Sequence, residues 1–409
     1  MNKFHTKKKI LKNVNICVAS AWYPYAGNPY HCIFVHEFAK RITRAGARAY
    51  VLSIAHTVKD KNIDKMDNIQ ILRVRPTHSF SFLRSSARSG KLSLAALYVL
   101  LLNLRDLLIV PQAFKASALI HVHAADLFGA LSAILGRIMG KPVVITVHRG
   151  DVLPSHDLIY KLARSIALKV SNVIIAVSHS TRNLAIRCGA PPKRVIVVYN
   201  TVDESIFRPR SQTICRSKLG LSQKYEVILS VGNLIPRKGY DQLIRAFPKI
   251  LNDVHDAVLI IVGDGPQKKE LALLVSDLKL EDKVIFTGRI PIDKLCLYYS
   301  AADIFVLPSM HEGHAMVLLE GMASGLPVVA SRVAGNLETV VHNQNGYLVQ
   351  PNDINQLAEA VTKILSDERL IHSFGSQSFR MYKSKFSQEQ QIHKIVQIYS
   401  GIIHRYEDL

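Results

Sequence analysis

Short apolar runs rich in Val and Ile alternate with helical patterns along this chain, and the alternation restricts the fold more than any other feature. In the first half these runs show little strict polar–apolar alternation, as expected of parallel strands covered by helices on both faces. The same theme restarts in the second half. An α/β fold with two doubly wound domains is therefore predicted. The predicted strands are 14–20, 49–55, 69–74, 119–123, 143–148, 172–178, 195–199, 227–232, 257–265, 284–288, 303–309 and 328–331.

The chain length also favours two domains, because 409 residues exceed the roughly 250–300 at which a single core stops growing. The polar segment 200–213, which contains Pro209, is the best candidate for the linker. We expect an N-terminal domain at 1–208, a C-terminal domain at 209–385, and an amphipathic helix at 386–409 that returns to the N-terminal domain.

Cysteine usage and hydropathy indicate the compartment. The five cysteines are scattered without a CxxC pair, which favours free thiols in a reducing compartment. The basic N-terminus resembles a lysine tail entering a first strand more than a signal peptide. The most apolar stretch, Leu92–Leu104, has 13 residues, whereas a bilayer span needs roughly 20. We expect a cytoplasmic protein that is soluble or bound to a membrane surface.

Charge divides the two halves of the chain. Residues 1–210 hold 31 Lys and Arg against 10 Asp and Glu, whereas residues 211–409 hold 21 of each kind. The whole excess of +21 therefore lies in the first half. Such asymmetry predicts a polyanionic partner for the first domain. An anionic membrane, an anionic acceptor and a nucleic acid each fit this charge.

The stretch HEGHAMVLLEGMASGLPVVAS places Glu312 and Glu320 with seven residues between them. It follows a predicted strand, so HEGHA forms a loop at the carboxyl end of that strand, where open α/β sheets bind ligands. The helix that begins there offers unpaired N–H groups from about His314 to Val317, a natural phosphate site. Glu320 is then suited to a ribose and Glu312 to a sugar. A capping glutamate beside a solvated one explains the spacing equally well.

The same stretch resembles the EX7E signature of retaining glycosyltransferases of family 4, which have the GT-B fold. VGNLIPRKG (231–239) resembles the family's phosphate loop, VGDGP (262–266) its next strand end, and FTGRIPIDKL (286–295) its nucleobase loop. In the first half, TVHRGDV (146–152) is similar to the family's HGSD segment. AWYPYAGNPYHCIFVHEFAK (21–40) is similar to the variant found in envelope-polysaccharide glycosyltransferases.

This resemblance implies two Rossmann-like domains that face each other across a cleft, with the donor in the C-terminal domain and the acceptor in the N-terminal one. The implied reaction moves a sugar from a nucleotide-sugar to a saccharide or lipid-linked acceptor with retained anomeric configuration. No Asp-x-Asp at a strand end and no His/Cys cluster with metal spacing is present in the sequence. We expect no metal, and no cofactor apart from the donor substrate.

The resemblance also implies roles for individual residues. His148 is expected near the reaction centre, Lys238 at the donor diphosphate and Glu312 near the transferred sugar; the plain alternatives are a core histidine and a solvated lysine. The chain departs from the family at Arg149, where Gly is frequent, and at Asn233, where Arg is usual, so that Arg237 is a possible substitute. His314 and Ala315 replace the usual Phe and Gly. The residues assigned to donor binding are Gly27, Asn233, Arg237, Gly263, Arg289, Ile290, His314, Ala315, Met316, Val317 and Glu320.

Other interpretations come from the same and from a different class. Another GT-B enzyme, such as a non-hydrolysing sugar-nucleotide epimerase or a phosphorylase, would share the fold and the sugar-phosphate site. The basic first half also fits a nucleic-acid-binding module. The sequence contains no helix-turn-helix, RNP-type or zinc pattern, however, and the aromatic residues of the first half are dispersed. We therefore expect contact with an anionic membrane and none with nucleic acid.

Overall fold

The computed structural model describes residues 11–25, 27–28, 31–56, 60–61, 63–74, 106–155 and 157–407, with the backbone alone at 106–109 and 407. The chain forms two compact units, here called unit 1 (Met1–Val198 with Ile392–Leu409) and unit 2 (Tyr199–Gln391). The apolar stretch Leu92–Leu104 lies outside the described residues. The sequence places the domain boundaries at residues 208 and 385. These boundaries stay predictions.

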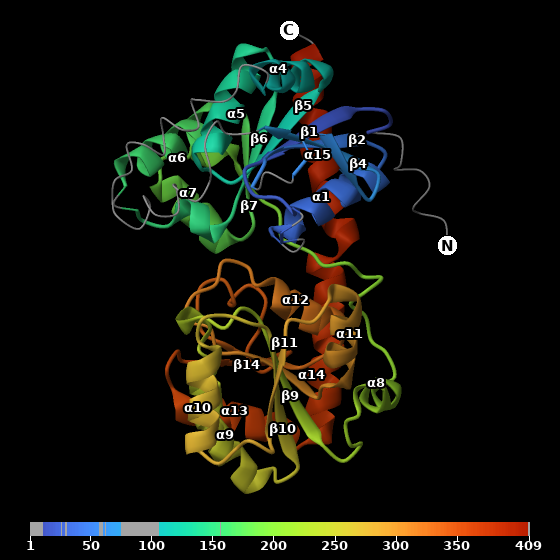
Figure 1. The fold of residues 1–409 in the computed structure, drawn as a ribbon, viewed down its shortest axis with the longest axis vertical. Helices are drawn as coiled ribbons and strands as arrows, with labels where there is room; N and C mark the ends of the chain where they lie inside the picture. The colour runs from blue at the N-terminus through green and yellow to red at the C-terminus, as the bar shows by residue number, and fades with distance from the viewer. Residues whose placement is uncertain are drawn as a thin grey trace. The chain divides into compact units, whose positions relative to one another are not determined.

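Unit 1 is built on one sheet with the strand order β3-β4-β2-β1-β5-β6-β7-β8; Figure 1 labels β1, β2, β4, β5, β6 and β7 of this sheet. All neighbouring pairs are parallel except β3 and β4, which form an antiparallel hairpin. The hairpin turns at Asp67 and Asn68, both with positive φ. The strands are β1 Asn15–Ser20, β2 Arg48–Ile54, β3 Ile63–Met66, β4 Ile69–Val74, β5 Leu119–His123, β6 Val143–Val147, β7 Val173–Ala176 and β8 Val195–Val197.

Helices cover both faces of this sheet. One core contains apolar side chains of α4, α5, α6 and α7, and the other contains those of α1 and α15. Because the strands are apolar on both faces, each face needs such a cover. The helices in the described part of unit 1 are α1 Ile33–Arg44, α4 Asp106–Ala116, α5 Leu127–Ile138, η1 Arg149–Val152, α6 Leu158–Val170, α7 His179–Arg187, η2 Pro192–Arg194 and, from Ile392 on, α15 Gln388–Glu407.

Unit 2 repeats the design with the fully parallel order β11-β10-β9-β12-β13-β14. Its strands are β9 Glu226–Val231, β10 Ala257–Val262, β11 Val284–Gly288, β12 Ile304–Leu307, β13 Val328–Ser331 and β14 Gly346–Val349. Helices α9, α10 and α13 cover one face, and α11, α12 and η4 cover the other. The helices are α8 Gln212–Leu219, η3 Pro236–Lys238, α9 Tyr240–Asp253, α10 Lys268–Asp277, α11 Ile292–Ala301, α12 Met316–Ala323, α13 Ile354–Leu365, α14 Glu368–Met381 and η4 Tyr382–Phe386.

Each sheet has one point at which the strand order reverses. In unit 1 the first strand, β1, lies between β2 and β5, and in unit 2 the first strand, β9, lies between β10 and β12. The loops that leave the carboxyl ends of such strands diverge to opposite faces, which opens a crevice between them. The predicted class of two doubly wound α/β domains is confirmed, and it provides two crevices for ligands. None of the helices in the described part of the chain is long and apolar enough to cross a bilayer.

Candidate active site

The crevice of unit 2 holds a buried ion pair between two predicted catalytic residues. Lys238 lies at the end of η3, in the loop after β9, and Glu312 lies in the loop after β12. The Lys238 Nζ atom is 2.6 Å from Glu312 Oε1, and the two side chains are 12% and 9% exposed. The structure thus joins residues that are 74 positions apart in the sequence. A buried cation beside a carboxylate is a site that can bind both phosphate and hydroxyl groups.

A glycine allows the two loops to approach so closely. Gly239, directly after Lys238, has φ +67°, and a Cβ atom there would lie 2.2 Å from the carbonyl oxygen of Pro308. The Met310 N–H also donates to the Arg237 carbonyl oxygen at 2.8 Å. The loop that carries Lys238 is therefore fastened by its backbone to the loop that carries Glu312.

Two further predicted donor residues, Asn233 and Arg237, lie on the exposed side of the same loop. The Arg237 guanidinium makes a long hydrogen bond of 3.5 Å to the His311 carbonyl oxygen. Arg237 is therefore an exposed cation next to Lys238 on this loop, whereas Asn233 carries an uncharged amide.

The first turn of α12 provides a place for an anion. Its N-cap residue, Ala315, makes no side-chain capping hydrogen bond, so the orphan N–H groups of the turn are not capped by that residue. Met316 and Val317 are half-buried at this turn and pack against the core of unit 2. This uncapped turn lies between Glu312 and Glu320, and the phosphate position expected there stays a prediction.

His314, just before this turn, is a buried neutral ring. Burial lowers the pKa of His314 to about 3. The ring stacks on Tyr199 with centroids 5.2 Å apart, and Phe386 lies 5.3 Å away. Neither ring nitrogen has a hydrogen-bond partner among the residues that the structure describes.

Glu320 is half-buried, and its carboxylate accepts a hydrogen bond from a tyrosine that sequence reasoning missed. The Tyr299 hydroxyl, on α11, donates to Glu320 Oε2 at 2.7 Å. Burial raises the pKa of Glu320 to about 7, and the Tyr299 hydrogen bond acts in the opposite direction. The only sequence signal for Tyr299 is its helical spacing from Cys296 and Leu295, which places it on the inner face of α11. The neighbouring residue, Tyr298, is also a tyrosine, so the sequence alone does not show which of the two contacts Glu320.

The predicted nucleobase residues lie at the carboxyl ends of β10 and β11. The Gly263 N–H donates to the Gly288 carbonyl oxygen at 2.9 Å. Arg289 follows and is exposed, while Ile290 is half-buried against the core of unit 2. These residues therefore lie at the carboxyl ends of the strands, the same end of the sheet at which the loop with Lys238 follows β9.

Two of the predicted site residues, Gly27 and His148, belong to unit 1. His148 follows β6; burial lowers the pKa of its ring to about 4. The ring lies 4.7 Å from Phe34 and 6.1 Å from His123, centroid to centroid. The His148 backbone N–H donates to Asp151 Oδ2 at 2.7 Å, and burial raises the pKa of Asp151 to about 7. Gly27 lies in an exposed turn beyond β1.

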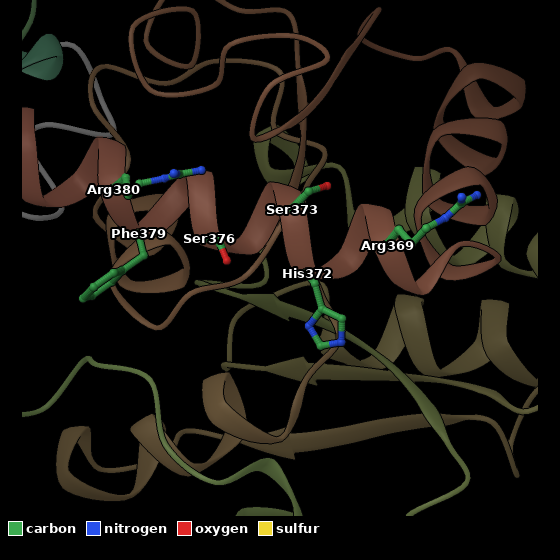
Figure 2. Close-up of a pocket in the computed structure, with 6 residues that line it drawn as sticks. All are labelled: Arg369, His372, Ser373, Ser376, Phe379 and Arg380. Atoms are coloured by element: carbon green, nitrogen blue, oxygen red, sulfur yellow. The ribbon is translucent and has the colours of Figure 1, made fainter.

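A surface groove on unit 2 is distinct from this crevice. Figure 2 shows its lining side chains, which all project from one helix, α14. None of them was assigned to the site, and α14 does not follow the carboxyl end of β9, β10 or β12. The lining residues are Arg369, His372, Ser373, Ser376, Phe379 and Arg380. Within the described ranges, no group of three or more His, Cys, Asp or Glu side chains is arranged to hold a metal ion.

Comparison with known proteins identifies the class. The family model "Glycosyl transferases group 1" matches residues 211–381, and the model "Glycosyltransferase Family 4" matches residues 33–206. The N-acetyl-alpha-D-glucosaminyl L-malate synthase of Bacillus anthracis is 30% identical over 70% of this chain and 75% of that protein. A GDP-mannose-dependent alpha-(1-6)-phosphatidylinositol monomannoside mannosyltransferase of Mycolicibacterium smegmatis is 32% identical over 61% of this chain and 69% of that protein.

A solved structure agrees on the fold. HepE of Anabaena, solved in complex with UDP and glucose, superposes with a TM-score of 0.74 at 21% identity, over 95% of this chain and 100% of HepE. At this identity the likeness establishes the fold alone. The two Rossmann-like units, together with these matches, define a GT-B glycosyltransferase. The chain belongs to glycosyltransferase family 4, and the resemblance carried by the EX7E stretch is confirmed.

Proposed function

We propose that this protein is a retaining glycosyltransferase that moves a sugar from a nucleotide-sugar to a saccharide or lipid-linked acceptor in polysaccharide or cell-envelope biosynthesis. The observation that carries the proposal is the buried Lys238–Glu312 pair beside the uncapped first turn of α12. The relatives support it, since one is named for GDP-mannose as donor and HepE was solved with UDP and glucose.

The donor diphosphate would bind between Lys238 and the first turn of α12. Negative charge grows on the leaving phosphate as the glycosidic bond breaks, and a fixed ammonium group stabilises that charge most in the transition state. A diphosphate competes with Glu312 for the Lys238 cation. The Glu312 carboxylate is then available to the hydroxyl groups or the developing positive charge of the transferred sugar.

The nucleoside would extend from the diphosphate along the same edge of the sheet. Glu320 accepts hydrogen bonds from ribose hydroxyls, and Tyr299 orients that carboxylate. The backbone at Gly263, Arg289 and Ile290 then contacts the base. His148, neutral at physiological pH because burial lowers its pKa to about 4, offers one hydrogen-bond donor and one acceptor to the reacting groups.

Metal independence is part of the proposal. Lys238 and Arg237 supply two cations at the proposed diphosphate site, so the protein's own side chains perform the charge neutralisation that Mg²⁺ performs elsewhere. Turnover that is unchanged by a chelator is the expected result, and restoration of activity by added Mg²⁺ or Mn²⁺ after chelation would contradict it.

We further propose a cytoplasmic protein that binds the surface of an anionic membrane. The excess positive charge lies in residues 1–210. Helix α6 of unit 1 exposes two leucines at i and i+4 spacing, Leu158 (76%) and Leu162 (59%), with the exposed Lys161 between them. Apolar side chains flanked by cations suit the interface of an anionic bilayer.

A screen of UDP-, GDP- and ADP-sugars for thermal stabilisation tests the proposed function. A donor present at about 100 times its Kd stabilises the folded state by about 2.7 kcal/mol. We expect one nucleotide class to raise the Tm, and to raise it less when the sugar or the diphosphate is absent. Release of the nucleoside diphosphate on adding an acceptor extract would complete the test. No stabilisation by any donor would contradict the proposal, and isomerisation without acceptor or phosphate-dependent release of a sugar 1-phosphate would favour an epimerase or a phosphorylase.

A further inference from the structure

A cluster of four aromatic rings lies after the carboxyl ends of β1 and β2 in unit 1. We call it the ring platform: Trp22, Tyr25, His31 and His56. Trp22 stacks on His56 at an interplanar angle of 14° with centroids 5.4 Å apart, and Tyr25 lies 4.8 Å from His56. His31 lies 5.4 Å from Trp22, 5.8 Å from Tyr25 and 5.5 Å from His56. Each ring therefore contacts its neighbours, although the residues come from two separate loops.

The ring platform occupies the crevice of unit 1. Trp22 follows β1, and its indole group is hydrogen-bonded to the carboxylate of Asp126, which follows the neighbouring strand β5. These two strands flank the point at which the strand order reverses, where open α/β sheets place ligands. Lys238 and Glu312 occupy the equivalent position in unit 2. In each unit, therefore, side chains that can bind a ligand lie at the point where the strand order reverses.

Local hydrogen bonds hold the platform in place. The Ser20 hydroxyl donates to the Trp22 carbonyl oxygen at 2.8 Å. The His56 backbone N–H donates to Asp60 Oδ2 at 2.8 Å. Rings whose backbones are fixed lose little conformational freedom when a ligand binds, which favours binding.

Trp22 is exposed and the other three rings of the platform are half-buried, unlike the core rings of unit 1. Trp22 is 40% exposed, whereas Tyr23 is 0% and Phe38 5% exposed. Burial lowers the pKa of His56 to about 4, with His31 acting in the same direction, so this ring is neutral at physiological pH. Arg73, a buried cation, donates to the Pro24 carbonyl oxygen and lies 3.9 Å from Asp64. Among the residues described in these loops, Trp22 therefore presents an exposed aromatic ring beside the Asp126 carboxylate.

We infer that the ring platform is the acceptor subsite and that it takes an uncharged pyranose ring, stacked on Trp22 and Tyr25. A pyranose presents an apolar C–H face to an aromatic ring and hydroxyl groups at its edge, and the Asp126 carboxylate can accept from such a hydroxyl. A small carboxylic acid lacks that face and is repelled by Asp126. This inference rests on the proposed function, since a transferase needs an acceptor site, and it restricts the acceptor to a neutral saccharide end.

Trp22 is the only tryptophan of the chain, so intrinsic tryptophan fluorescence reports directly on the platform. The probes are the methyl pyranosides of glucose, mannose, galactose and N-acetylglucosamine, with sorbitol and malate as controls. We expect a saturable change in emission with at least one pyranoside, with a Kd on the order of 1–10 mM as for a single sugar ring. Sorbitol, which has the hydroxyl groups without the rigid C–H face, and malate, which is a small anion, should cause no saturable change.

A matched pair of variants separates stacking on a flat aromatic ring from simple contact with an apolar side chain. Tyr25→Phe keeps the ring and should keep the affinity, whereas Tyr25→Leu keeps apolar bulk without a flat ring and should weaken binding about 3–10-fold. Calorimetric titration of the stabilising nucleotide-sugar should give the same affinity for both variants and the wild type. No saturable change with any pyranoside, a response to malate, or equal affinities of Tyr25→Leu and Tyr25→Phe would each overturn the inference. Failure of the donor titration would instead overturn the proposed function.

Discussion

At the scale of single residues, the Lys238–Glu312 pair makes a prediction that separates stability from catalysis. Removing one partner of a buried pair leaves an uncompensated charge, so Lys238→Met and Glu312→Leu should each lower the free energy of unfolding by about 3 kcal/mol. The double variant replaces both charges with apolar groups and should regain most of this loss. Denaturant unfolding of the four proteins measures the cycle.

Turnover should follow a different pattern. All three variants should lose activity with the nucleotide-sugar while binding the free nucleoside as the wild type does, because the pair is proposed to act on the leaving phosphate and the sugar. A double variant that regains both stability and turnover would show that the pair is structural only.

Glu320 makes a prediction about pH. Burial raises the pKa of Glu320 from 4.5 to about 7, so the folded state binds a proton between these values more strongly than the unfolded state does. The resulting stability is fully present below pH 4.5 and is lost as the pH rises through 7. Glu320→Gln cannot titrate and keeps an acceptor for the Tyr299 hydroxyl.

Relative to the wild type, Glu320→Gln should therefore gain stability on the order of 2 kcal/mol between pH 5 and pH 8. Unfolding free energies of the two proteins across this range check the prediction, since all other titrating groups are shared. A difference between the proteins that does not change with pH would show that the carboxyl is solvated.

At the scale of elements, the apolar pattern predicted most strands because parallel strands buried on both faces read as continuous runs. It missed β3 and β14. The four residues of β3 include the charged Asp64 and Lys65, and β14 begins at Gly346, so neither contains a run long enough to be recognised. The pattern also extended the strand at 257–265 to Gly263–Gly265, although β10 ends at Val262.

The site was predictable only in part for a related reason. Motif resemblance identified Lys238 and Glu312 one by one, but their ion pair depends on β9 and β12 being neighbours, which no local spacing records. Tyr299 and the ring platform likewise depend on contacts between distant segments. Sequence patterns specify which loop carries a residue, and the order of strands specifies which loops meet.

The packing of strand ends against each other makes a prediction about Gly263. Its φ is +143°, and a Cβ atom there would lie 1.9 Å from the carbonyl oxygen of Gly232. Gly263→Ala should lower the free energy of unfolding by about 2–3 kcal/mol or more and weaken donor binding, because the backbone must shift. Gly220→Ala is the matched control, since Gly220 also has positive φ (+69°) but has no atom within 4 Å of the added Cβ. The control should cost only about 1 kcal/mol. Equal losses in the two variants would contradict the close-packing argument.

At the scale of the whole molecule, the charge asymmetry and α6 predict membrane binding. The protein should co-sediment with anionic vesicles at low salt, leave them as the salt concentration rises, and ignore neutral vesicles. Leu158→Gln combined with Leu162→Gln should weaken binding by about 10-fold or more, because burial of each leucine contributes about 1.5–3 kcal/mol. Leu273→Gln, at an equally exposed position (67%) on α10 of unit 2, is the control and should have no effect. Binding that is absent at low salt would remove membrane docking and leave the transferase proposal intact.

The central claim is that unit 2 binds a nucleotide-sugar through the segment from Glu312 to Glu320. Calorimetric titration of the stabilising nucleotide-sugar into the wild type and Glu320→Ala tests it most directly. Loss of a charged acceptor for ribose hydroxyls costs about 1.5–3 kcal/mol, so the variant should bind roughly 10–150-fold more weakly. An unchanged affinity of Glu320→Ala for both the nucleotide and the nucleotide-sugar would contradict the claim.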